Sequence, residues 1–258
     1  MEKKIRNIIK KKGKKPLVCL TAYSFIFSRI LDKYCDLILV GDSLANVVYS
    51  MKNTHEISLD TMILHAKSVV KGIKKSVCVV DMPKNTYKNK LQAKNNAKKI
   101  LKETKANAVK IESNGNNYEI IEYLVKNKIS VMGHIGFTPQ FKKKFSPAGM
   151  NKKEENILIS DAKNIQRAGA FSIVLECISS QASKRISNIL RIPTIGIGSS
   201  SNCDGQILVT DDMLGLSGFN PKFVKKFAQL NKVIEKGVQK YKNSVIKKTF
   251  PKKNNSFN

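Results

Sequence analysis

Tryptophan is absent from the 258-residue sequence, and no apolar run approaches the ~20 residues that a membrane span requires. The opening residues 1–6 lack the apolar core and cleavage site of a signal peptide. Cysteine is sparse, and the sequence contains no C-x-x-C pair, which argues against both a disulfide framework and a zinc site. The five cysteines are Cys19, Cys35, Cys78, Cys177 and Cys203. We therefore expect a cytoplasmic protein with no membrane partner.

Acidic residues are also scarce. Lysine and arginine number 47 against 19 Asp and Glu, a net charge of +28. Such a balance would suit nucleic acid, but base and phosphate recognition favours arginine, and nearly all of these cations are lysines spread over the whole chain. We interpret them as a solvated surface and expect no nucleic-acid partner. The positive field would still attract anionic small substrates.

A hydrophobic content of 41% suffices for a sizeable core, and short apolar runs alternate with helical patterns along the chain. The expected strands cover residues 17–22, 37–40, 77–83, 108–112, 130–136, 170–176, 193–198 and 206–209. Eight strands alternating with helices predict a (β/α)8 barrel, a TIM barrel, with a doubly wound sheet as the alternative. The expected catalytic domain covers residues 1–250, with a capping helix over 5–12 and a C-terminal helix from Pro221 to about Tyr241. Residues 251–258 form a polar tail that we expect to be disordered.

The most informative stretch is the apolar run 37–40, which ends at Gly41-Asp42-Ser43. A continuous apolar run that stops at a turn signal indicates a parallel strand covered on both faces. Its acid then lies at the carboxyl end of the strand, the edge at which such folds bind ligands. A helix N-cap is the alternative role for Asp42 and Ser43.

Three further acids repeat this position. Asp81, Glu112 and Glu176 stand at the ends of the third, fourth and sixth expected strands, so with Asp42 they converge on one mouth of a barrel. Four carboxylates in one mouth require a cation, and hard oxygen ligands suit Mg²⁺. For any one acid, a helix N-cap or a loop salt bridge is the alternative.

Two other polar residues belong to the same region. Lys110 lies two residues before Glu112 and shares its face, so it could receive a substrate carboxylate or form a buried ion pair with an acid. His134 follows an apolar run between two glycines and could donate to a substrate or serve as a structural hydrogen bonder. His55 and His65 are interpreted as packing residues.

Eight motifs in order over residues 5–250 resemble the ketopantoate hydroxymethyltransferase family. They are Leu20-Thr21-Ala22-Tyr23, Val40-Gly41-Asp42-Ser43-Leu44, Asp81-Met82-Pro83, Val109-Lys110-Ile111-Glu112, Met132-Gly133-His134-Ile135-Gly136-Phe137-Thr138-Pro139-Gln140, Val174-Leu175-Glu176-Cys177, Ile192-Pro193-Thr194-Ile195-Gly196-Ile197-Gly198 and Cys203-Asp204-Gly205-Gln206. The resemblance implies a Mg²⁺-dependent barrel enzyme of pantothenate synthesis. It would transfer a hydroxymethyl group from 5,10-methylenetetrahydrofolate to 3-methyl-2-oxobutanoate, giving 2-dehydropantoate through a Mg²⁺-stabilised enolate. It also implies a homodecamer.

The resemblance assigns roles by position. Asp42, Asp81 and Glu112 match the metal-site acids, and Glu176 matches the proton acceptor. The oxo-acid contacts implied are Asp42, Ser43, Asp81, Lys110 and His134. A carboxylate at its ordinary pKa of ~4.3 is a poor base for a C–H proton, so enclosure near an apolar side chain should raise the pKa of Glu176 toward neutrality.

The sequence departs from the family pattern at three places. Ser24 replaces a usual Asp, Ala45 replaces a usual Gly, and the loop from Phe145 to Met150 differs from the usual glycine-rich one. That loop flanks the expected mouth, so folate affinity and the identity of the oxo acid depend on it. The alternative function is another Mg²⁺-dependent oxo-acid barrel enzyme, a lyase or mutase of the phosphoenolpyruvate mutase/isocitrate lyase type.

Overall fold

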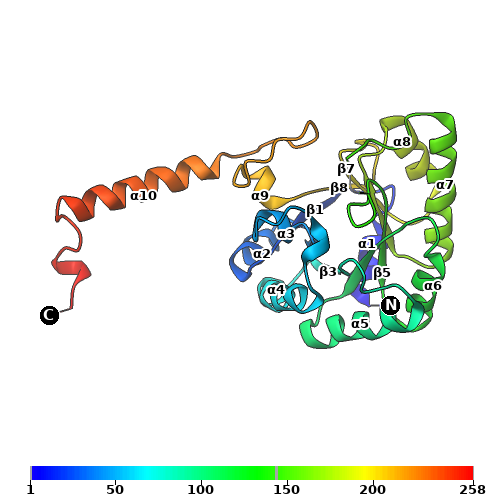
Figure 1. Ribbon diagram of the computed structural model, residues 1–258, viewed down its shortest axis with the longest axis horizontal. Coiled ribbons are helices and arrows are strands. Elements are labelled where there is room, and N and C mark those ends of the chain that lie inside the picture. Colours follow the sequence, from blue (N-terminus) through cyan, green and yellow to red (C-terminus); the bar gives the residue numbers. More distant parts are fainter. Residues whose placement is uncertain (1, 143–144, 258) are drawn as a thin grey trace. The chain divides into compact units, whose positions relative to one another are not determined.

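The computed structural model describes residues 2–142 and 145–257. Eight parallel strands pair in chain order, and β8 closes on β1 to form a barrel (Figure 1). The strands are β1 Leu17–Thr21, β2 Leu37–Val40, β3 Val77–Asp81, β4 Ala108–Glu112, β5 Val131–Gly136, β6 Ser172–Glu176, β7 Thr194–Ile197 and β8 Gly205–Leu208. The prediction of a (β/α)8 barrel is confirmed, and the closed sheet excludes the doubly wound alternative.

Helices precede β1, lie between successive strands from β1 to β7 and follow β8, and those between the strands cover the outside of the barrel (Figure 1). They are α1 Lys3–Lys10, α2 Phe25–Leu31, α3 Leu44–Val47, α4 Leu59–Gly72, α5 Lys90–Thr104, α6 Tyr118–Lys126, α7 Lys152–Arg167, α8 Ser180–Ile189, α9 Thr210–Met213 and α10 Leu230–Ile246, with 3₁₀ turns η1 Thr54–Glu56 and η2 Lys253–Asn255. Side chains of Ser58, Asn89, Asn151 and Ser179 cap the starts of α4, α5, α7 and α8. Each accepts a backbone N–H of the first turn, which fixes where the helix begins.

The chain forms two compact units, Met1–Val209 and Thr210–Asn258. All eight strands lie in the first unit, and Ile5 and Ile8 of α1 are buried in the cluster that fills the barrel interior. The expected N-terminal capping helix is therefore present. The expected boundary of the catalytic domain at residue 250 and the disorder of residues 251–258 stay predictions.

Side chains inside the barrel change character along the strands. Near the amino ends the interior is apolar, with Leu37, Val77, Val79, Ala108 and Met132 in one buried cluster. The period of two carries the same strand faces upward to ionisable side chains at the carboxyl ends. These are Asp81 after Val79, Lys110 and Glu112 after Ala108, and His134 after Met132. The barrel interior is therefore charged near the carboxyl ends of the strands. Below these charges, near the amino ends, the apolar cluster forms the floor of the site.

The expected start of the C-terminal helix at Pro221 is wrong. Helix α10 begins at Leu230 and ends at Ile246, and Pro221 starts only a single turn closed by Val224. The backbone N–H groups of Phe227 and Leu230 donate instead to the carbonyls of Met213 and Leu214, at 2.8 Å each. Those two bonds hold the segment against the end of α9 and prevent a continuous helix.

No helix in the described chain is long and apolar enough to cross a membrane.

The Gly136→Ala variant tests how closely β5 and β6 approach at the mouth. Gly136 has φ +100°, and a Cβ there would lie 2.1 Å from the carbonyl oxygen of Glu176. We expect the free energy of unfolding to fall by about 2–4 kcal/mol, since backbone strain and overlap with a rigid carbonyl add together. Urea unfolding measures the change.

The Gly13→Ala variant is the matched control. Gly13 also has a positive φ, +65°, but nothing lies within 4 Å of the position of its Cβ. The conformational cost alone is about 1 kcal/mol. Equal losses in the two variants would contradict the close approach at Gly136.

Candidate active site

The seven residues singled out in the sequence gather at the carboxyl ends of β2 to β6. Strand register explains the gathering, because Asp81 pairs with Lys110, and Glu112 pairs with His134. Glu176 ends β6 beside Gly136 of β5. Asp42 and Ser43 directly follow β2, as expected. Side chains up to 134 positions apart in the sequence therefore share one mouth.

Asp42, Asp81 and Glu112 are buried acids. The backbone N–H of Asp42 donates to Asp81 Oδ2 at 2.9 Å, which ties the ends of β2 and β3 together. Burial raises the pKa of the Asp81 carboxyl, with Lys110 opposing the rise and the charge of Asp42 adding to it. Burial also raises the pKa of Glu112, again against the pull of Lys110. The site holds more negative charge than its own cation balances.

Lys110 is the buried cation among these acids. Its Nζ lies 3.2 Å from Asp81 Oδ1 and 3.1 Å from His134 Nδ1. Burial works against the ammonium, but the charges of Asp81, Glu112 and Asp42 outweigh it and raise its pKa, so Lys110 stays protonated. Of the two roles considered for Lys110, the buried ion pair with an acid is present in the structure, and it holds the ammonium at the mouth.

His134 is neutral, because burial and the nearby charge of Lys110 lower its pKa well below the usual range. Since Nδ1 receives the Lys110 ammonium, we assign the ring proton to Nε2. Nε2 lies 3.1 Å from Glu176 Oε2, but the angle is unsuitable for a hydrogen bond, and among the described residues this buried nitrogen has no such partner. An N–H donor therefore stands beside Glu176 and is available to a ligand oxygen.

Glu176 ends β6 with 18% of its side chain exposed, so its carboxyl reaches the open side of the site. Burial raises its pKa to about 7, with Lys110 acting in the opposite direction. This agrees with the shift expected from the sequence, although the cause is general enclosure. The carboxyl is half ionised near neutral pH, as a general base requires.

Ser43 begins the turn after Asp42, and its Oγ lies 2.8 Å from the hydroxyl of Tyr23, which follows β1. Gly41 makes room for this arrangement, since a Cβ at that position would lie 2.8 Å from Ser43 Oγ. Ser43 is only partly buried and lies at the mouth beside the acids. It is placed to contact a small ligand there.

Gln140 also belongs to this site, although no role was predicted for it. It is 1% exposed, and its Nε2 donates to Asp42 Oδ2 at 2.8 Å and to the carbonyl of Met82 at 3.0 Å. Its backbone N–H donates to Glu112 Oε2 at 3.0 Å, and its Oε1 accepts from the hydroxyl of Tyr87. One residue thus orients acids from two strands. The Gly-Phe-Thr-Pro-Gln motif contained it, but no local pattern indicates a contact 98 positions away.

His55 and His65, expected to be packing residues, make hydrogen bonds to neighbouring loops. His65 bonds the Tyr23 carbonyl and the Tyr49 hydroxyl, and His55 bonds the Pro139 carbonyl.

The atypical loop from Phe145 to Met150 lies beside β6, because the Ala148 N–H donates to the Cys177 carbonyl at 2.9 Å. The loop therefore does flank the mouth at the strand that carries Glu176.

The buried acids Asp42, Asp81 and Glu112 are the candidate ligands for a divalent cation. No three His, Cys, Asp or Glu side chains within residues 2–142 and 145–257 form a ready-made metal cluster. Glu112 Oε1 is nevertheless a buried carboxylate oxygen with no hydrogen bond among the described residues, and Asp81 Oδ1, which also makes none, is ion-paired with Lys110 Nζ at 3.2 Å. Mg²⁺ is commonly held by one or two carboxylates together with water and substrate oxygens. The residues therefore fit Mg²⁺, which would balance the excess negative charge.

Fold and mouth together define a (β/α)8-barrel enzyme whose buried acids and buried Lys110 face one opening. The ketopantoate hydroxymethyltransferase family model matches residues 2–253, and the chain belongs to that family. It is accordingly a transferase. The 3-methyl-2-oxobutanoate hydroxymethyltransferase of Pelagibacter ubique is 49% identical over the whole of both chains. A second relative of that name, from Zymomonas mobilis, is 45% identical over 96% of this chain and 92% of its own.

Solved structures share the fold at low sequence identity. A putative phosphonomutase from Burkholderia cenocepacia superposes with a TM-score of 0.69 at 9% identity, covering 91% of this chain and 98% of its own. A phosphonopyruvate hydrolase solved with oxalate and Mg²⁺ gives 0.59 at 9% identity, with 81% of each chain covered. These similarities confirm the barrel architecture.

The Gln140→Met variant tests the bridging role of this residue. Methionine conserves volume but leaves Asp42 Oδ2, the Met82 carbonyl and the Tyr87 hydroxyl without their partner. We expect the free energy of unfolding to fall by about 2–4 kcal/mol, since each buried unpaired group costs about 1–3 kcal/mol. Urea unfolding measures this. Gln181→Met, at an exposed position, should change it by less than about 0.5 kcal/mol, and an equally small change at Gln140 would refute the bridge.

Proposed function

We infer that this transferase moves a hydroxymethyl group from 5,10-methylenetetrahydrofolate to 3-methyl-2-oxobutanoate, giving 2-dehydropantoate in pantothenate synthesis. Family membership supports the reaction. The observation that carries the mechanism is the pair at the mouth, in which Glu176 has a pKa of about 7 and the neutral His134 stands 3.1 Å away. A base and a donor side by side are what removal of a proton next to a carbonyl requires.

The oxo acid is oriented by three side chains. The Lys110 ammonium receives its carboxylate, because this is the buried cation among the acids and its position is fixed by Asp81 and His134. Ser43 contributes a hydroxyl from the turn after β2. His134 directs its Nε2–H toward the substrate oxygens without bringing a second positive charge.

Glu176 then takes the proton from C3 of the oxo acid. The C–H electron pair forms the enolate, and the negative charge moves onto the keto oxygen. The enolate carbon attacks the methylene carbon carried by the folate, and the first of its two C–N bonds breaks. Water then displaces the second folate nitrogen and supplies the hydroxyl oxygen of the product. Tetrahydrofolate leaves with two protons, one from water and the one that Glu176 removed from C3. Glu176 begins this sequence ionised, and the partial exposure of its side chain gives it access to C3.

Asp42, Asp81 and Glu112 would hold Mg²⁺. When bound, the ion offsets the negative charge that develops on the keto oxygen. Gln140 orients Asp42 and Glu112 through its side chain and its backbone N–H, respectively, so the acids approach the ion from fixed directions. The phosphonopyruvate hydrolase with the same fold was solved with Mg²⁺ and oxalate, a dicarboxylate with two adjacent oxygens.

A lyase or mutase acting on an oxo acid is the second candidate, because several solved structures with this fold carry such names, including phosphoenolpyruvate phosphomutase. Both functions use an enolate, so the folate-dependent second step separates them. We further propose that the chain acts in the cytoplasm and assembles as a homodecamer, as the family resemblance implies.

The first half-reaction tests the base. With Mg²⁺ and without folate, we expect the protein to exchange the C3 proton of 3-methyl-2-oxobutanoate for deuterium, as followed by NMR. Glu176→Gln should slow this exchange by about 10²–10⁴-fold, the usual contribution of a general base. Exchange at the wild-type rate would mean that another group takes the proton.

The exchange rate should also depend on pH. Because the pKa of Glu176 is raised to about 7, the base is protonated and inactive below that pH and ionised above it. The rate should therefore rise about tenfold per pH unit on the acid side and level off above about pH 7. A plateau reached already near pH 5 would contradict the raised pKa.

Mg²⁺ dependence tests the metal site. Asp81→Asn should raise the Mg²⁺ concentration needed for half-maximal exchange by at least about tenfold, since one buried ligand loses its charge. Mg²⁺ should also raise the melting temperature of the wild type but not of this variant. Asp60→Asn, on the exposed surface of α4, is the control. Full activity with unchanged Mg²⁺ dependence in Asp81→Asn would exclude Asp81 as a ligand.

A further inference from the structure

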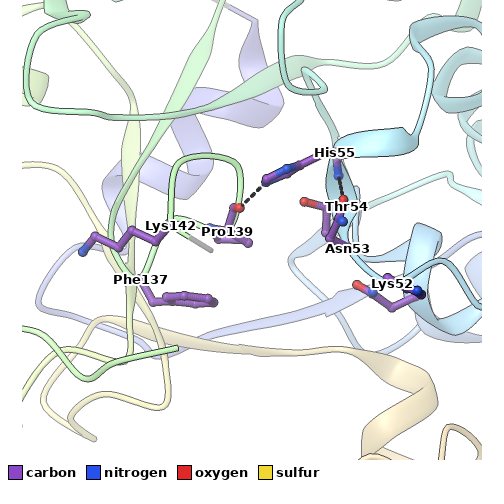
Figure 2. Close-up of a pocket in the computed structure, with 8 residues that line it drawn as sticks. Lys52, Asn53, Thr54, His55, Phe137, Pro139 and Lys142 are labelled. Carbon is purple, nitrogen blue, oxygen red and sulfur yellow. Dashed lines mark hydrogen bonds between the residues drawn. The ribbon is translucent and has the colours of Figure 1, made fainter. Parts of the chain in front are cut away.

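A pocket lies beside the acid cluster and is lined by cationic and neutral side chains instead of acids. It measures about 400 Å³ and is lined by Asn46, Lys52, Asn53, Thr54, His55, Phe137, Pro139 and Lys142. Figure 2 shows these side chains, with residues 52–55 contributed by one segment and Phe137, Pro139 and Lys142 by another. The first segment follows β2 and the second follows β5, so the pocket opens at the carboxyl ends of the strands.

The pocket is positive. Lys52 and Lys142 line it, although the Lys142 ammonium donates to the Gly136 carbonyl at 2.7 Å and points away from the other lining residues (Figure 2). Lys84, which does not line the pocket, places its ammonium 3.1 Å from His55 Nδ1. His55 Nε2 donates to the Pro139 carbonyl at 2.8 Å, which leaves Nδ1 to accept from Lys84 (Figure 2 shows the first of these bonds). Among the described lining residues there is no carboxylate. The acid cluster and this pocket therefore have opposite charges at the same end of the barrel.

Thr54 indicates that the pocket holds a ligand. This lining residue is only 6% exposed, yet its Oγ1 is a buried hydroxyl with no hydrogen-bond partner among the described residues. An unpaired buried polar group costs about 1–3 kcal/mol, so folds rarely keep one without a use. Its neighbour His55 is held by two bonds, and Asn53 caps the same turn, so the hydroxyl has a fixed position.

The pocket is joined directly to the acid cluster. Pro139 lines the pocket, and the next residue, Gln140, donates to Asp42 of the acid cluster at 2.8 Å. On the other side, Asn46 lies on α3, which starts just after Ser43. A ligand with one end over the acids can therefore extend its other end into the positive pocket.

We propose that this pocket binds the glutamate carboxylates of the folate co-substrate. The assignment rests on the proposed function, which requires a folate at the neighbouring acid cluster. Lysine ammoniums and a hydroxyl donor suit carboxylates, whereas the amino groups of a pterin ring need acceptors. Phe137 supplies an apolar ring beside which the aromatic linker of a folate can lie. The pterin with its one-carbon unit then faces the oxo acid, and the charged tail points away from the acids that would repel it.

The test compares two ligands by isothermal titration calorimetry, tetrahydrofolate and tetrahydropteroate, which lacks the glutamate. The wild type should bind tetrahydrofolate about tenfold more tightly. Lys52→Met and Thr54→Val should each remove most of that preference while leaving the affinity for tetrahydropteroate unchanged. Lys98→Met, which removes an exposed lysine from α5, should keep the preference.

Thr54→Val also separates a ligand contact from a structural role. Because the hydroxyl is unpaired, its replacement by a methyl group should leave the melting temperature unchanged or raise it, while tetrahydrofolate binds about tenfold more weakly. If both variants keep the wild-type preference, or if both ligands weaken equally, the tail does not bind here. If the wild type binds neither ligand and makes no product, the proposed function itself fails, and the subsite assignment with it.

Discussion

The excess of buried negative charge at the barrel mouth is the constraint on which the rest of the site depends. Asp42, Asp81 and Glu112 face the ammonium of Lys110, the one buried lysine within residues 2–142 and 145–257. Isolated ions are costly to bury, so the closed sheet, the apolar floor and the bonds from Gln140 must hold these groups in place. The raised pKa values of Asp81 and Glu112 record that cost, and binding of a cation would relieve it.

The same field assigns different tasks to two neighbouring side chains. Lys110 remains charged because three acids surround it, and burial together with the charge of Lys110 lowers the pKa of His134 and keeps it neutral. A neutral His134 can place an N–H beside Glu176 without forming a salt bridge that would hold that carboxylate permanently ionised and weaken it as a base. The pKa of Glu176 near 7 follows from enclosure with little direct pairing. Base strength is therefore a product of the whole mouth.

The sequence predicted the parts of this arrangement that depend on short-range patterns. A parallel strand places its last residue at the mouth, and the period of two places Lys110 and Glu112 on one face, so both could be read locally. The role of Gln140 and the unpaired hydroxyl of Thr54 could not, because each depends on which loops meet across the barrel. The start of α10 failed for a similar reason, since backbone bonds to Met213 and Leu214 override the helix signal at Pro221.

The loop after β5 makes the site and the neighbouring pocket a single unit. Gly136 starts it with a φ of +100°, which turns the chain so closely over β6 that the Phe137 N–H bonds the Glu176 carbonyl at 2.8 Å. Phe137 and Pro139 then face the pocket, while Gln140 faces the acids. Residues 136–140 thus bond the backbone of Glu176, orient Asp42 and Glu112, and line the pocket. A displacement of this loop would disturb all three at once, so the same piece of backbone sets the position of Glu176, the proposed base, and the shape of the neighbouring pocket.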